Sequence, residues 1–317
     1  MARYGAQQSG LESIERVLPN LIILVVLVLA LLVVVTKFGW VHCSQVPGIN
    51  WCGTYCTYVV QGKSRIGILY GQDGLGDPQA LRAQLSRKRG FTLVEPIEAK
   101  ELSAGILRKY DLLVVEHFKT ASTRQVDAIS GYLDSGGTMV WSGDSLSNQF
   151  IDDYDLQLAR TKNETFYREL LSYNVTPNSA QWTGAWNQVK SSLWYQYLYN
   201  HTTVSGFGAL EDYLHARFGS IVNSTSTEFR IVDPDHLLVR GLIKQHGLLS
   251  TSFVQVLPDA SKTSIVAQVV TPGNNSAVYP GVIETRYAGK IVYVAFPLEQ
   301  SNSSTFLTNL IDYLAPC

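Results

Sequence analysis

The chain has 317 residues and a formal net charge of −1, and only 16% of its residues are charged. This length suits one large domain or two small ones. The near-neutral balance gives no electrostatic case for nucleic-acid binding, which normally needs a concentrated basic face, so we expect no nucleic-acid partner.

An apolar segment near the N-terminus predicts a transmembrane helix over residues 17–40. Its core, residues 21–35, carries no charge. About 20 helical residues cross the ~30 Å hydrocarbon core of a bilayer, and Lys37 and Trp40 suit its interfacial zone. A cleaved signal peptide is the alternative, but its apolar core is usually only about 7–15 residues and precedes a small-x-small site. The core here is longer and no such site follows, so we expect a retained anchor that contacts membrane lipid.

Glycosylation sequons indicate the topology. Six of the thirteen asparagines start an Asn-x-Ser/Thr triplet, all after the apolar helix, where about two matches would arise by chance. They are Asn163, Asn174, Asn200, Asn223, Asn274 and Asn302. We therefore expect residues 1–16 to form a cytoplasmic tail. The C-terminal domain is expected to be glycosylated and extracytoplasmic, at the cell surface or in an equivalent of the endoplasmic reticulum lumen.

The four cysteines are Cys43, Cys52, Cys56 and Cys317, three of them in a short predicted stalk over residues 41–62. An even number outside the cytoplasm favours disulfides, with three possible pairings. A bridge to the last residue would close a long loop and restrict the unfolded chain. The spacing of Cys52 and Cys56 loosely matches a zinc site, but His42 is the only histidine nearby. We expect no metal and no cofactor.

From residue 63 short apolar runs alternate with helical patterns. Strands are predicted at residues 64–71, 91–97, 111–118 and 138–143, and helices at residues 78–90, 100–110 and 123–137. This alternation predicts βαβ units with right-handed crossovers, and thus a three-layer α/β fold of flavodoxin or amidotransferase-like type around a parallel sheet. Ligand sites in such sheets lie beyond the carboxyl ends of the strands. The loops expected there are residues 71–77, 116–120 and 142–148.

Residues 149–227 interrupt this pattern and are predicted to form an inserted, mainly helical cap. Aromatic residues gather in it, and Trp182, Trp186, Trp194 and Tyr195 are candidate contacts for a partner chain or a glycan. They could equally form the small core of the insertion. Strands return at residues 228–233, 251–258 and 264–272, a hairpin spans residues 282–296, and a helix closes the domain at residues 303–315.

Several phrases of the chain, in this order, resemble the class I glutamine amidotransferase-like superfamily, especially its ThuA-like and membrane-anchored branches. The phrases are RIGILYG, KYDLLVVEHF, YLDSGGTMVWSGDS, DPDHLLVRGL and ETRYAGKIVYVAFPLE, which begin at residues 65, 109, 132, 233 and 284. The resemblance covers about residues 63–148 and 228–315. It implies a nucleophilic cysteine on the turn after a strand and a late His-Pro-Glu motif. Here the turn reads Ser142-Gly143-Asp144-Ser145, the late motif reads Phe296-Pro297-Leu298-Glu299, and no cysteine lies between Cys56 and Cys317. Glutaminase activity should therefore be lost.

Ser145 is a possible substitute nucleophile, with His117 as base and Asp144 or Glu116 as the acid. The simpler explanation is that Ser145 caps the next helix and His117 is a polar loop residue. Asp73 and Asp77 could bind a cation, but turn roles are the simpler expectation.

Three functional hypotheses follow from these patterns. The leading hypothesis is a non-catalytic, membrane-anchored binding or scaffold domain that is a subunit of a membrane or cell-surface complex. One form of this hypothesis is a complex that handles glycans. The alternatives are a surface hydrolase that uses His117, Asp144 and Ser145, and a homomeric surface-layer or filament component.

Overall fold

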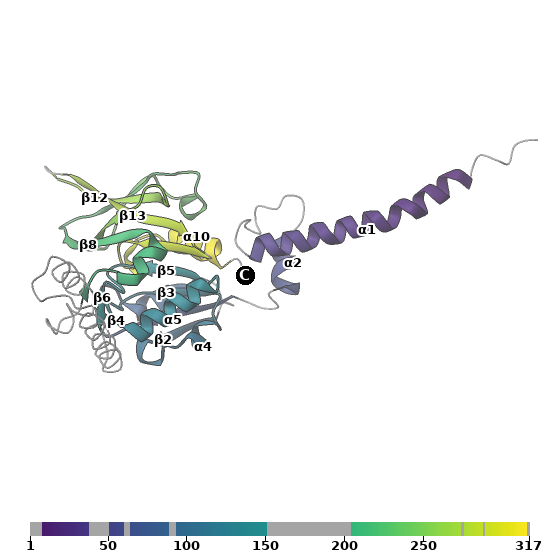
Figure 1. Ribbon diagram of the computed structural model, residues 1–317. Helices are drawn as coiled ribbons and strands as arrows, with labels where there is room; N and C mark the ends of the chain where they lie inside the picture. The colour runs from purple at the N-terminus through teal and green to yellow at the C-terminus, as the bar shows by residue number, and fades with distance from the viewer. Residues whose placement is uncertain are drawn as a thin grey trace, which may run out of the picture. The chain divides into compact units, whose positions relative to one another are not determined.

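The computed structural model describes residues 8–37, 51–59, 64–88, 93–150, 204–273, 276–287 and 289–315. The chain divides into two compact units, one of Met1–Gly62 with Pro316–Cys317 and the other of Lys63–Ala315. The second unit contains the α/β domain that the sequence predicts (Figure 1).

The first unit contains a long helix, α1 (Gln8–Lys37), and a short one, α2 (Trp51–Tyr58). Within α1, Leu18–Thr36 has a mean hydropathy of 3.2, which is long and apolar enough to cross a membrane; a signal sequence has the same properties. Cys52 and Cys56 lie on α2, whereas Cys43 and Cys317 lie outside the described residues, so the disulfides stay a prediction.

The domain is built on a nine-stranded mixed sheet with the order β10-β9-β12-β13-β14-β5-β3-β1-β2. One half is parallel and comprises β1 (Arg65–Tyr70), β2 (Leu93–Glu98), β3 (Leu112–Val115), β5 (Thr138–Ser142) and β14 (Lys290–Val294). The other half is antiparallel and comprises β9 (Glu228–Ile231), β10 (Gln245–Gly247), β12 (Thr263–Thr271) and β13 (Ala277–Arg286), with β13 also antiparallel to β14.

The predicted parallel sheet is therefore correct for only half of the strands. Residues 272–276 connect β12 to β13, and residues 287–289 connect β13 to β14. Connections this short can join only antiparallel neighbours, because a parallel crossover needs a dozen or more residues.

The two faces of the sheet bury two separate hydrophobic clusters. One cluster includes Ile66, Ile68, Leu112, Val114, Val140, Val292 and Val294, and the other includes Leu69, Leu113, Val115, Met139, Trp141, Ile291 and Tyr293. Burial on both faces explains why these strands read as continuous apolar runs rather than alternating ones.

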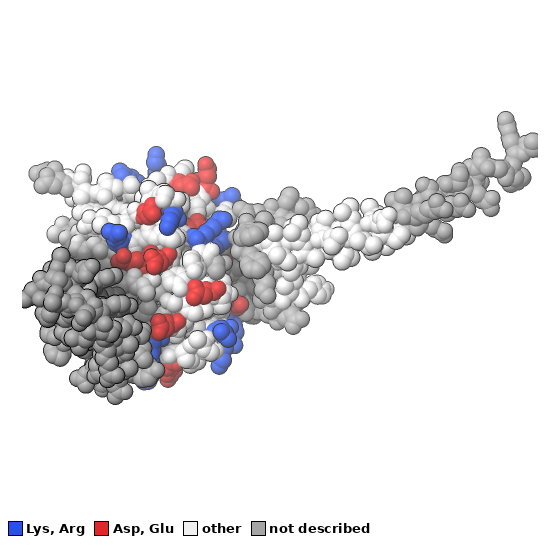
Figure 2. Space-filling view, in the orientation of Figure 1, with Lys and Arg blue, Asp and Glu red and all other residues white. Residues whose placement is uncertain are grey.

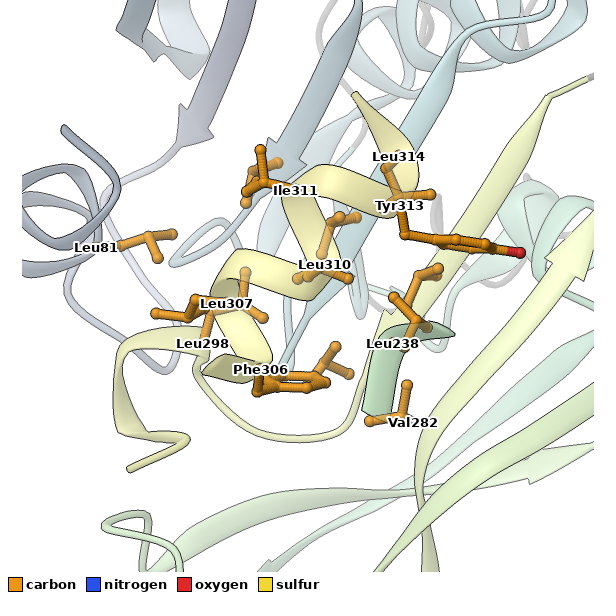
Figure 3. Close-up of a cluster of buried hydrophobic side chains, with 14 of the residues drawn as sticks. Leu81, Leu238, Val282, Leu298, Phe306, Leu307, Leu310, Ile311, Tyr313 and Leu314 are labelled. Carbon is orange, nitrogen blue, oxygen red and sulfur yellow. The ribbon is translucent and has the colours of Figure 1, made fainter. Parts of the chain in front are cut away.

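Helices cover both faces and complete the three layers. On one side α10 (Ser304–Leu314) packs its apolar face among Leu81, Leu238 and Val282 (Figure 3). Leu81 belongs to α3 (Pro78–Lys88), which joins the same cluster. The other face is covered by α5 (Thr123–Asp134), next to the single-turn helix α4 (Ala104–Leu107). A capping box between Ser122 and Gln125 starts α5.

The described ends of the predicted insertion are mainly strands rather than helices. At the first end lies β6 (Asn148–Phe150). At the second end, β7 (Val204–Ser205) is followed by the single-turn helix α9 (Glu211–Leu214) and then by β8 (Ala216–Asn223). β8 pairs in antiparallel fashion with β11 (Ser252–Pro258). Ala216 and Phe218, two positions apart on β8, both pack in the hydrophobic core. Residues 151–203 of the insertion lie outside the described residues.

Charge is evenly distributed over the face of the domain that Figure 2 shows. Acidic and basic side chains are interspersed there, without a patch of one sign, whereas Leu18–Thr36 of α1 carries no charge. A surface of this kind gives a nucleic acid no concentrated basic site on that face.

Candidate functional site

The carboxyl ends of four adjacent parallel strands, β1, β3, β5 and β14, meet at one edge of the sheet. The loops that follow them are residues 71–77, 116–119, 143–147 and 295–301. The sequence predicted the first three. It missed the fourth, because residues 282–296 were interpreted only as a hairpin, without the parallel pairing of β14 with β5.

Buried polar atoms without partners concentrate at this edge. Among the described residues, seven buried side-chain polar atoms have no hydrogen-bond partner, and five of them belong to these four loops. The five are Oε1 of Glu116, Nδ1 of His117, Oγ of Ser145, Oγ of Ser147 and Oε2 of Glu299. Incomplete hydrogen bonding of buried groups is a feature of functional or strained sites, so we take this edge as the candidate functional site.

The glycine-rich loop 71–77 is held by its own aspartates. Asp73 accepts hydrogen bonds from the hydroxyl (2.6 Å) and the backbone N–H (3.1 Å) of Thr120. Asp77 accepts from the backbone N–H groups of Gln79 (2.9 Å) and Ala80 (3.1 Å) in the first turn of α3. These contacts fit the turn role predicted for the two aspartates, and Asp77 in addition caps the start of α3, which was not predicted.

The turn after β5 is closed by contacts with its neighbours. Gly143 adopts a positive φ of 56°, which glycine tolerates without steric cost. Its carbonyl accepts a 2.8 Å hydrogen bond from the hydroxyl of Tyr293, and burial raises the pKa of that phenol. Asp144 is almost fully buried, and its Oδ1 accepts a 2.6 Å hydrogen bond from the backbone N–H of Leu75. Lys119 Nζ lies 3.9 Å from the other carboxylate oxygen. Asp144 therefore fastens the glycine-rich loop to the turn.

The structure does not join the three residues of the hydrolase hypothesis by hydrogen bonds. Ser145 has no exposed surface, and its Oγ has no partner among the described residues. His117 has a positive φ of 54°, and its buried Nδ1 likewise has no partner in that part of the chain. The hypothesis of Ser145 as a helix cap is wrong, because the next element is β6, whose Asn148 pairs with Thr120 of β4 (Thr120–Ser122).

A pair of carboxyl groups lies beneath the glycine-rich loop. Glu116, at the end of β3, is fully buried, and its Oε2 accepts hydrogen bonds from Ser142 Oγ (3.1 Å) and from the backbone N–H of Leu298 (2.9 Å). Glu299 accepts a 3.1 Å hydrogen bond from the backbone N–H of Asp77. Burial, and then the neighbouring charge of Glu299, raise the pKa of Glu116 well above its usual value.

Glu116 is therefore expected to be protonated over a wider pH range than an exposed glutamate. The cause is mainly the burial of Glu116, which disfavours its charged form. The pair connects the ends of β1, β3, β5 and β14 through the contacts of Asp77, Ser142 and Leu298. Sequence reasoning mentioned both glutamates but did not pair them.

A second polar cluster lies at the opposite end of β14. His236 Nε2 is 2.7 Å from Glu284 Oε2, and the Tyr313 hydroxyl donates a 2.6 Å hydrogen bond to Glu284 Oε1. His236 Nδ1 accepts from the backbone N–H of Leu238 (3.3 Å), so its proton is assigned to Nε2. Burial alone would raise the pKa of Glu284, but these hydrogen bonds lower it below the usual value. Burial lowers the pKa of the neighbouring Lys290 to about 8.

Most of the other predicted site residues lie outside the described residues. This applies to the sequons at Asn163, Asn174, Asn200 and Asn274 and to the aromatic residues Trp182, Trp186, Trp194 and Tyr195. Asn223 and Asn302 are both exposed, as glycan acceptors must be, but nothing tests their occupancy.

The insertion starts and ends beside the candidate site. β6 pairs in parallel with β4, and β7 pairs in antiparallel fashion with β6, with Gln149 opposite Val204. The backbone N–H of Gly206 donates a 2.6 Å hydrogen bond to the carbonyl of Ser147. The chain thus leaves for residues 151–203 and returns from them at adjacent strands, next to the loops of the site.

Comparisons with known proteins find solved structures that are similar to this chain only at low identity. No family model matches the sequence, and no curated protein matches it. A ThuA-like protein from Bacteroides uniformis is 12% identical over 80% of this chain and 91% of its own, with a TM-score of 0.48. A GMP synthase component from Thermoplasma acidophilum is 12% identical over 80% and 94%, with a TM-score of 0.41.

A cold-adapted β-galactosidase from Rahnella sp. R3 is 17% identical over 79% of this chain, with a TM-score of 0.47. The match spans about a third of that enzyme, 31% of its length.

Proposed function

We propose that the chain is a single-pass membrane protein whose α/β domain is a non-catalytic binding or scaffold subunit of a membrane or cell-surface complex. In this proposal the N-terminus is cytoplasmic, and the domain is extracytoplasmic and glycosylated. The observation that carries the proposal is the state of the turn after β5. There Asp144 and Ser145 are buried, and the Asp144 carboxylate holds the backbone of the glycine-rich loop.

Catalysis by a serine needs a base within hydrogen-bond reach of the hydroxyl and a path for the substrate to the same oxygen. Ser145 has neither in the described part of the chain, because its Oγ is fully buried and without a partner. Opening the turn would break the hydrogen bond from Leu75 N–H to the Asp144 carboxylate. Hydrogen bonds to charged groups contribute about 1.5–3 kcal/mol each.

The binding surface in this proposal is the aromatic insertion. Its two ends leave the domain at β6 and β7, beside the candidate site. Trp182, Trp186, Trp194 and Tyr195 belong to the segment between them. Tryptophan and tyrosine are enriched at protein interfaces, and their rings also stack on sugars. Partner chains and glycans are therefore the ligand classes we favour.

Co-purification of the full-length chain in mild detergent tests this proposal. A partner chain should be recovered in fixed ratio with the wild-type protein. The double variant Trp182→Ala with Trp186→Ala should lose about tenfold or more of it, as expected when interface hot spots are truncated. Ser145→Ala, the matched control, should retain the partner.

Other results would point to the alternatives. Recovery of this chain alone, as a defined oligomer, would favour the homomeric surface component. Recovery of a partner that the double tryptophan variant retains would contradict the assignment of the contact to the insertion. Thermal unfolding of both variants checks that a loss of partner does not reflect a loss of folding.

A further inference from the structure

The part of the first unit that follows α1 has an unusual composition. From residue 38 to residue 62 the chain has no Asp, Glu, Lys or Arg, between Lys37 and Lys63. At the chain average of 16% charged residues, a segment of this length would hold about four. It also contains five tryptophan, tyrosine and phenylalanine residues. Few charges and many aromatic rings are typical of the interfacial zone of a membrane rather than of a stalk in water.

Within this segment, α2 packs against the last turn of α1. The indole N–H of Trp51 donates a 2.9 Å hydrogen bond to the hydroxyl of Thr36, the last residue of the apolar span. Trp51 is 4% exposed and Tyr55 is 6% exposed, and their ring centroids lie 6.3 Å apart. Residues four apart share one face of a helix, so this face of α2 is the one directed at α1. Figure 1 shows α2 next to the end of α1.

The next turn of α2 exposes apolar surface. Tyr58 is 74% exposed and Val59, which follows the helix, is 39% exposed. A tyrosine side chain has an apolar ring and a polar hydroxyl. At a membrane interface the ring can contact lipid while the hydroxyl contacts water. The position of α2 at the end of the apolar span would place this surface beside lipid in a protein whose α1 crosses a membrane.

We propose that α2 is an interfacial helix, with Trp51 and Tyr55 held against α1 and Tyr58 in contact with lipid at the boundary between headgroups and acyl chains. This inference rests on the proposed function, since it requires α1 to cross a membrane. The surface contributes no formal charge, so the contact does not depend on anionic lipid. The role of α2 is to fix the end of α1 at the membrane surface.

Photo-crosslinking of the full-length chain in lipid nanodiscs tests the inference. We would place p-benzoylphenylalanine at Tyr58, at Leu27 in the span and at Tyr287, a half-exposed residue of the domain. Lipid adducts are measured by mass spectrometry in phosphatidylcholine discs, with and without an anionic lipid. The expected yield at position 58 is about tenfold or more above that at position 287, and it is unchanged by anionic lipid or salt.

The three positions separate the possible failures. The interfacial helix would be overturned if position 27 forms adducts but position 58 gives no more than the background yield seen at position 287. The membrane anchor would then remain intact. No adducts at position 27 would overturn the membrane anchor itself. A Trp51→Ala variant should lower the yield at position 58 several-fold and leave position 27 unchanged. An unchanged yield at position 58 would contradict the role of the Trp51–Thr36 contact.

Discussion

Replacing Glu116 by glutamine tests whether the buried carboxyl group of Glu116 holds a proton. The introduced amide would keep the hydrogen bonds of the glutamate, because its carbonyl oxygen can accept from Leu298 N–H and Ser142 Oγ. Unlike the glutamate, it cannot ionise. Glu116→Gln therefore isolates the effect of ionisation from the loss of contacts.

The expected magnitude follows from the direction of the pKa shift. Because the pKa of Glu116 is raised in the folded state, its contribution to stability is fully present below about pH 4.5 and is lost as pH rises toward the folded-state pKa. The loss amounts to about 1.4 kcal/mol for each pH unit within that window. The difference in the free energy of unfolding between Glu116→Gln and the wild type should thus shift in favour of the variant by about 1.4 kcal/mol for each pH unit above pH 4.5.

Urea unfolding of the full-length chain in mild detergent, followed by tryptophan fluorescence from pH 4.5 to pH 8, measures this difference. Glu101→Gln removes the same formal charge at an exposed position and is the matched control for net charge. Parallel stability curves for wild type and Glu116→Gln over the whole range would refute the raised pKa of Glu116.

Three further predictions concern other parts of the domain. Asp144→Ala should lower the free energy of unfolding by about 2–3 kcal/mol in urea titrations, because the Leu75 N–H loses a charged acceptor; an effect below about 0.5 kcal/mol would contradict its role. Lys290→Met should raise stability by about 1–3 kcal/mol near pH 7, after allowance for the contact of the amine with the Tyr313 ring. Because the folded-state pKa of Lys290 is about 8, wild-type stability should rise from pH 8 toward pH 10.5 and the advantage of the variant should shrink; a constant advantage would refute the shift. In a host with N-glycosylation, Asn223→Gln and Asn302→Gln should each remove one glycan on gel mobility, whereas an unchanged mobility shows that the site is not occupied.

The sequence predicted the first half of the domain well. β1, β3 and β5 are buried on both faces, and such strands appear as compact apolar runs that glycines and helical patterns separate. The loops that follow them were placed correctly for the same reason. The sequence did not predict the direction of the later strands, because a doubly buried strand reads alike in parallel and antiparallel sheets. Only the short connections around β13 distinguished the two arrangements.

The candidate site was harder to predict, because its main contacts join distant parts of the chain. Leu298 donates to Glu116 across 182 residues, and Asp77 donates to Glu299 across 222 residues. No local spacing signals such pairs. The pairing of Asn148 with Thr120, which makes β6 follow the turn in place of a helix, is likewise a tertiary contact.

Labelling of the full-length chain with a fluorophosphonate probe, which reacts with activated serines, tests the central claim most directly. A non-catalytic domain with a buried, unactivated Ser145 should give the same labelling, at the level of the heat-denatured protein, in the wild type and in Ser145→Ala. Stoichiometric labelling of the wild type that Ser145→Ala abolishes would contradict the claim and establish a hydrolase.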